Sequence, residues 1–152
     1  MEIVYSDNNS EINIDGKETI FLAGPSPRNN TDYNWRKKAI RIFDQSGFDG
    51  IIFIPLPKGE FKHSYLEQIE WEQKYIKSCD KLLFWIPRDL VKLPGFTTNI
   101  EFGQFIKSDK IYYGRPDDAP KNRYLDTIFK MNQGNKEIHN NLELLIKQVI
   151  NI

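Results

Sequence analysis

The sequence has little of what small secreted or metal-dependent domains rely on. It contains one cysteine, Cys79, so no disulfide framework can form, and we expect a reducing compartment, the cytoplasm. His63 and His139 lie far apart, and no histidine or cysteine has a partner at zinc-ligand spacing, so we expect no metal. Glycine-rich dinucleotide, P-loop and nucleophile-elbow motifs are also missing, and we expect no cofactor.

The sequence also lacks an excess of charge of either sign. Its 21 basic residues balance 21 acidic ones, which argues against nucleic acid or a membrane surface as a partner. No apolar run approaches the roughly 20 residues of a membrane-spanning helix, and residues 1–17 lack the basic and apolar regions of a signal peptide. A chain of 152 residues is most simply one domain, so we expect a single domain over residues 1–152.

From Thr19 onwards, short apolar runs alternate with amphipathic segments. The runs are continuously apolar, as expected of strands buried on both faces of a parallel sheet. The pattern therefore predicts an α/β fold: a doubly wound parallel sheet of four to five strands with helices on both faces. The expected strands are residues 19–24, 50–55, 81–87 and 110–114, and the expected helices are residues 33–47, 64–80, 97–108, 122–131 and 135–151. Residues 1–18 form an N-terminal extension, in which "EIVY" and "EINI" flank a turn-rich stretch and predict a small β-hairpin.

In open parallel sheets, ligands bind at the carboxyl ends of the strands, where the strand order reverses. Residues 24–32, 55–63, 87–99 and 114–121 are the loops that leave those ends. The first loop offers Ser26 and Arg28, and the last offers Arg115. The planar guanidinium groups suit a phosphate, a carboxylate or a ring edge, although simple exposure to solvent explains them as well.

Two carboxylates deserve separate interpretations. Thr98 and Glu101 fit the T-x-x-E capping box of a helix start, but a carboxylate in a first helical turn can also be an active-site group, ionised by the positive end of the helix dipole. Glu72 falls on the expected inward stripe of its helix with Tyr65, Ile69 and Ile76. A carboxyl on an apolar face has a raised pKa and stays protonated near neutrality. A small rotation of the helix, with Trp71 and Tyr75 inward, would instead send Glu72 to solvent.

Several ordered motifs now resemble one family. "IFLAGPSPR", "NWRKKAIRIF", "WEQKYIKSCDKLLFWIPR", "LPGFTTNIEFGQF" and "YGRPDDA" are similar to the nucleoside 2-deoxyribosyltransferase-like family over about residues 19–130. The resemblance implies a flavodoxin-like domain and a pentosyltransferase that cleaves the N-glycosidic bond of 2′-deoxynucleosides. It implies that Glu101, in an E-F-G setting, attacks C1′ to form a covalent deoxyribosyl-enzyme, after which another base takes the sugar.

The resemblance also implies the other site residues. Glu72 stands where typical transferases carry an aspartate that contacts the base, and it can protonate the leaving base as the acid of a retaining glycosidase does. The loop from Gly24 to Arg28 corresponds to the sugar and base pocket. Six aromatic residues lie near enough to these loops for some to stack on a base: Phe21, Trp71, Phe84, Trp85, Phe96 and Phe102. The expected substrate-binding residues are Gly24, Pro25, Ser26, Arg28, Phe96, Thr98, Asn99 and Arg115.

Three functions stay open. The first is base exchange between 2′-deoxynucleosides in nucleotide salvage, with a nucleoside and a free nucleobase as small-molecule partners. The second is hydrolysis of a nucleoside or nucleoside 5′-monophosphate, although Pro25 and Pro27 remove backbone N–H groups that would hold a phosphate. The third is a non-catalytic nucleoside or nucleotide sensor. Because members of the family often complete their active sites across subunits, we expect a homo-oligomer, a dimer or higher.

Overall fold

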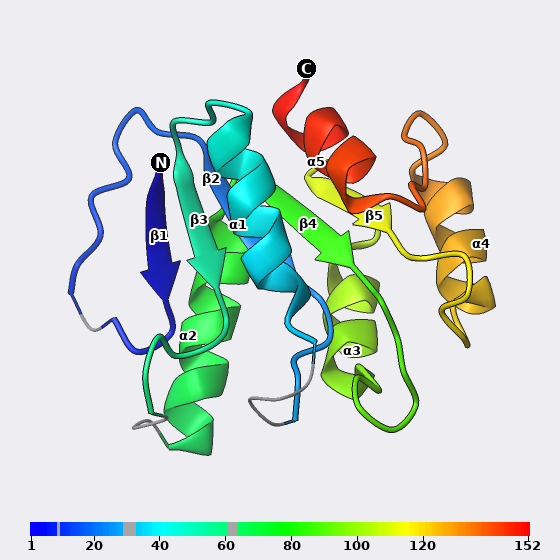
Figure 1. Cartoon of the computed structure of the whole chain (residues 1–152), viewed down its shortest axis with the longest axis horizontal. Helices are drawn as coiled ribbons and strands as arrows, with labels where there is room; N and C mark the ends of the chain where they lie inside the picture. The colour runs from blue at the N-terminus through cyan, green and yellow to red at the C-terminus, as the bar shows by residue number, and fades with distance from the viewer. Residues whose placement is uncertain (9, 29–32, 61–63) are drawn as a thin grey trace.

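A five-stranded parallel sheet forms the centre of the protein, in the order β1-β3-β2-β4-β5 (Figure 1). This computed structural model describes residues 1–8, 10–28, 33–60 and 64–152. The strands are β1 (Glu2–Tyr5), β2 (Thr19–Ala23), β3 (Ile51–Ile54), β4 (Lys81–Trp85) and β5 (Ile111–Gly114). The helices are α1 (Trp35–Gln45), α2 (Tyr65–Ser78), α3 (Phe96–Phe105), α4 (Arg123–Asn132) and α5 (Leu142–Ile150).

Helices cover both faces of the sheet. Because successive strand residues point to opposite faces, Ile20 and Leu22 of β2 pack with α1 and α5, whereas Phe21 and Ala23 pack on the side of α2, α3 and α4. The predicted doubly wound α/β fold is thereby confirmed. Without β1, the order β3-β2-β4-β5 is that of the first four strands of a flavodoxin-like sheet.

The predicted N-terminal hairpin is wrong. Glu2–Tyr5 does form a strand, but it lies parallel to β3, with Val4 opposite Phe53, and residues 11–14 form no strand. Glu2 is tied in by its N–H group, which donates to the Gly50 carbonyl at 2.9 Å. The first segment therefore extends the edge of the sheet instead of pairing with its neighbour in sequence.

Each helix begins at a residue other than the expected one, and the starts of α3 and α5 have identifiable causes. α3 begins at Phe96, with Gly95 as N-cap in the left-handed region at φ 67°, so Thr98 is its third residue and caps nothing. The capping-box interpretation of Thr98 and Glu101 is thus wrong. α5 begins at Leu142, because the residues before it bridge to the sheet: the Arg115 N–H donates to the His139 carbonyl at 2.9 Å.

The order of the strands reverses between β2 and β4. The chain leaves β2 towards β3 on one side and leaves β4 towards β5 on the other, so their carboxyl ends flank the crevice in which such folds bind ligands (Figure 1). In the described part of the chain, no helix has the length and apolar character needed to cross a membrane.

Candidate active site

A cavity of about 230 Å³ opens at this reversal point. It is lined by the loop after β2, by one residue of α2 and by the start of α3. Of the residues predicted from the sequence, it brings together Gly24, Pro25, Ser26, Arg28, Glu72, Phe96, Thr98 and Glu101. Pro55, Pro94, Gly95 and Thr97 complete the lining. Phe96, 74% exposed, is the one candidate stacking residue on this wall, since the other five aromatic side chains lie outside the lining.

The loop after β2 depends on a residue without a side chain. Gly24 has φ +147°, and a Cβ atom there would lie 2.1 Å from the carbonyl oxygen of Trp85 and 2.9 Å from the ring of Trp35. No other residue fits this approach of β2 to β4. Pro25, the next residue, is bonded to α1: its carbonyl accepts a hydrogen bond from the indole N–H of Trp35 at 3.0 Å.

Arg36 of α1 also holds the loop after β2 in place. Its side chain is 1% exposed, and its guanidinium donates to the carbonyls of Leu22 at 3.1 Å and Gly24 at 2.7 Å. It also donates to the Pro25 carbonyl and to Oγ of Ser26, at 3.3 and 3.2 Å. Among the described residues, no carboxylate lies within ion-pair distance of Arg36. Burial lowers its pKa to about 10, against the charges of Glu101 and Glu72, which raise it.

Glu101 lies in the second turn of α3, and its side chain enters the cavity wall. Its pKa is raised to about 7, mainly by burial and also by the nearby charge of Glu72, against the charge of Arg36, which lowers it. We expected the helix N-terminus to keep this carboxylate ionised. Glu101 lies beyond the first turn, where the dipole acts most strongly, and burial opposes the ionised form. A pKa of about 7 makes both the ionised and the protonated form of Glu101 accessible at neutral pH.

Glu72 is half-buried on α2. The predicted stripe was misplaced: Tyr65 is 77% exposed, and the buried residues of the helix are Gln68, Tyr75 and Ile76. Glu72 nevertheless keeps its inward position beside Gln68. Burial raises its pKa, in the predicted direction, whereas the hydrogen bond from Gln68 and the charge of Arg36 lower it.

Asn99 lies outside the lining of the cavity and has a supporting contact instead. Arg88, 5% exposed, donates to Oδ1 of Asn99 at 2.6 Å, to the Pro94 carbonyl and to Oδ1 of Asn122. These bonds hold the loop between β4 and α3 and fix the first turn of α3. Asn99 thus contributes to the position of Glu101 and not to the cavity wall.

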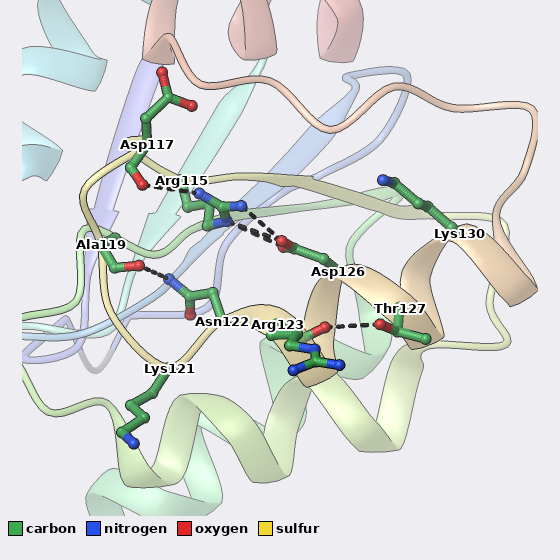
Figure 2. Close-up of a pocket in the computed structure, with 9 residues that line it drawn as sticks. All are labelled: Arg115, Asp117, Ala119, Lys121, Asn122, Arg123, Asp126, Thr127 and Lys130. Carbon is green, nitrogen blue, oxygen red and sulfur yellow. Dashed lines mark hydrogen bonds and ion pairs between the residues drawn. The ribbon is translucent and has the colours of Figure 1, made fainter.

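Arg115 also lies away from the cavity. Figure 2 shows its guanidinium facing Asp126 of α4, with Nη2–Oδ2 at 2.7 Å and Nε–Oδ1 at 3.1 Å. The Tyr113 hydroxyl donates to the same carboxylate at 2.9 Å. Arg115 and Asp126 line a separate groove of about 460 Å³ beside the start of α4. The carboxyl end of β5, at the sheet edge, is too far from the reversal point for Arg115 to join the other predicted residues.

Sequence reasoning missed three supporting residues: Arg36, Gln68 and Arg88. Arg36 did carry a signal, since it stands three and seven residues before Ala39 and Phe43 on the buried stripe of α1. Its position in the run Trp-Arg-Lys-Lys is typical of a solvated surface instead. Within the described ranges, no three His, Cys, Asp or Glu side chains gather as metal ligands would.

A cavity at the reversal point of a flavodoxin-like sheet, with two carboxyl groups in its lining, is suited to binding a small ligand. The sequence matches the nucleoside 2-deoxyribosyltransferase like family over residues 17–119. The chain belongs to this family, which suggests a glycosyl-transferring enzyme. None of the curated proteins compared with the chain matches it.

Proposed function

We propose that the protein is a nucleoside 2-deoxyribosyltransferase that exchanges the base of a 2′-deoxynucleoside. The observation that carries the proposal is the pairing of Glu72 and Glu101 in one cavity at the reversal point of the sheet. Two carboxyl groups, one deprotonated and one protonated, divide the work of retaining glycosidic cleavage into a nucleophile and an acid.

In this mechanism the ionised Glu101 attacks C1′ of the sugar. The bond from C1′ to the base nitrogen breaks, its electron pair stays with the base, and Glu72 supplies the proton that neutralises the leaving base. Attack by a second base on the glutamyl-deoxyribosyl bond reverses the steps and returns the proton to Glu72. The resulting product is a new deoxynucleoside.

The electrostatics of the cavity favour a pair of carboxyl groups that shares one proton. Burial raises the pKa of both carboxyl groups, so that the pair prefers to hold a proton, and the Glu101 value of about 7 allows ionisation at neutral pH. The positive charge of Arg36 favours ionisation of one of the two carboxyl groups, although Arg36 makes no hydrogen bond to either of them. Because the two carboxyl groups interact, a titration would give two pKa values for the pair and not one value for each residue.

Base exchange provides the test. Purified protein is fed deoxyinosine, deoxyadenosine, thymidine or deoxycytidine, with and without free acceptor bases, and products are separated by HPLC. We expect new deoxynucleosides only with an acceptor, and their loss in Glu101→Gln but not in Glu70→Gln, which changes an exposed carboxylate on α2. Undiminished turnover by Glu101→Gln would refute the nucleophile, and no turnover by the unaltered protein would refute the enzyme.

A second function, hydrolysis of a nucleoside 5′-monophosphate, is favoured by one observation. The N-cap residue of α3, Gly95, has no side chain to cap the helix, and Gly95, Phe96 and Thr97 line the cavity together with Ser26 and Arg28. Uncapped helix N-terminal N–H groups suit an anion, which offsets the loss of N–H groups at the loop prolines. Free base released from monophosphates at the same rate with and without acceptor would replace transfer with hydrolysis.

We further propose that the enzyme works in the cytoplasm, in nucleotide salvage, as a homo-oligomer. The lone cysteine supports the compartment. Exposed apolar side chains near the cavity support the assembly: Tyr65, Leu66, Phe96 and Ile100 are each more than 60% exposed. A mass of about 17.9 kDa on gel filtration with light scattering would contradict the oligomer.

A further inference from the structure

Gln68 lies one helical turn before Glu72 on α2 and is 8% exposed. Its amide nitrogen donates to Oε1 of Glu72 at 2.7 Å and to the Pro55 carbonyl at 3.3 Å. Both acceptors belong to residues that line the cavity, so Gln68 lies directly behind that part of the wall.

The Pro55 carbonyl determines which end of the amide faces Glu72. A carbonyl oxygen only accepts hydrogen bonds, so a Gln68 side chain turned by 180° would place its own oxygen against that of Pro55. In the orientation found, the buried Oε1 of Gln68 has no partner within the described residues, which is the unfavourable part of the arrangement. Gln68 therefore offers Glu72 a donor and no acceptor.

A protonated carboxyl group carries its hydrogen on one oxygen only. Since Oε1 of Glu72 must accept from Gln68, the hydrogen is left to Oε2. We propose that Gln68 is a positioning residue that confines the proton of Glu72 to Oε2, the oxygen that delivers it to the leaving base. This inference rests on the proposed function of Glu72 as the acid, and it adds the group that orients its proton.

In the described part of the chain, three groups interact with the Glu72 carboxyl from the elements packed around it. Gln68 is neutral and lies on the same helix, Arg36 approaches from α1 with a positive charge, and Glu101 approaches from α3 as a second carboxyl. The Gln68 bond and the Arg36 charge both lower the pKa of Glu72, against the burial that raises it. Loss of the Gln68 donor should consequently make Glu72 harder to ionise.

The first experiment needs no turnover. Protein with ¹³C-labelled glutamate carboxyls is titrated by NMR, with the Glu72 signal assigned from Glu72→Gln. In Gln68→Leu, which keeps the volume and removes the donor, we expect the Glu72 midpoint to move to higher pH. Gln73→Leu, on the same helix but bonded to Gln104, is the matched control and should leave the midpoint in place. An unmoved midpoint in a folded Gln68→Leu protein, as judged by circular dichroism, overturns the proposal.

The second experiment separates proton delivery from a general defect. The base of 7-methyl-2′-deoxyguanosine already carries a positive charge. It can therefore leave without a proton from the enzyme. We expect Gln68→Leu to lose about tenfold or more in kcat on deoxyinosine, a part of the roughly 10²–10⁴-fold that general acid catalysis contributes, and little on the methylated substrate. Equal losses on both would overturn the positioning role. If the unaltered protein converts neither substrate, the proposed function fails, while a shifted midpoint still supports Gln68 as the group that places the proton.

Discussion

Replacing Glu101 by glutamine should stabilise the protein, by an amount that depends on pH. The pKa of this carboxyl rises from 4.5 to about 7 on folding. Between these values the folded state holds a proton that the unfolded chain has released, so stability is full below 4.5 and is lost as the pH rises through 7. At about 1.4 kcal/mol per pKa unit, the ionised carboxylate lowers the free energy of unfolding by about 3 kcal/mol at pH 8.5 and by about 1 kcal/mol or less at pH 5.

Urea unfolding of Glu101→Gln at the two pH values measures this difference. We expect the variant to exceed the unaltered protein by about 3 kcal/mol at pH 8.5, or about 6–12 °C in Tm for a domain of this size. Glu70→Gln, which changes an exposed carboxylate, should show no such pH dependence. A gain of the same size at pH 5 and pH 8.5, or no gain at pH 8.5, would refute the assignment of Glu101 as a carboxyl destabilised by burial.

Three further results should follow from the site. Gly24→Ala should destabilise the protein by about 3 kcal/mol or more in urea unfolding, because its Cβ would meet the Trp85 carbonyl at 2.1 Å, whereas Gly59→Ala has open space and should change little. Arg115→Lys should keep kcat/KM in the base-exchange assay, since the Arg115 guanidinium pairs with Asp126 of α4 outside the cavity. A loss above about tenfold (about 1.4 kcal/mol) would show that Arg115 does act in the site. Turnover should rise with pH through about 7 as Glu101 ionises and fall again when the acid loses its proton, and a pH-independent kcat would contradict both roles.

The fold was predictable because its signals are repeated and local. Each central strand is a continuous apolar run, and β2, β3 and β4 are followed by proline within two residues, which marks the carboxyl ends clearly. Once those ends are known, parallel topology brings their loops to one edge of the sheet. That rule alone brought Ser26 and Glu101, 75 positions apart in the chain, to one cavity.

The errors arose where a local motif competed with a distant partner. "EIVY" and "EINI" read as a hairpin because they are neighbours in sequence, yet β1 pairs with β3, and no local pattern names a partner about 50 residues away. Thr98 and Glu101 satisfy a capping-box pattern, but Gly95 begins the helix earlier by adopting a left-handed conformation. Arg115 follows a strand as the other site residues do, but its strand lies at the edge, and only the strand order reveals this.

The electrostatics were the least predictable part, and they argue most strongly that the site is functional. Burying the Arg36 cation costs several kcal/mol, which one acceptor from β2 and three from the loop after it offset in part. A purely structural arrangement would add a direct ion pair with Glu101, which would lower the pKa of that carboxyl. In the described structure the pKa of Glu101 is raised to about 7, and Arg36 acts on it only at a distance. A partly buried carboxylate without a bonded cation destabilises the fold, but it keeps its oxygens free to attack a substrate, and perturbed groups of this kind gather at active sites.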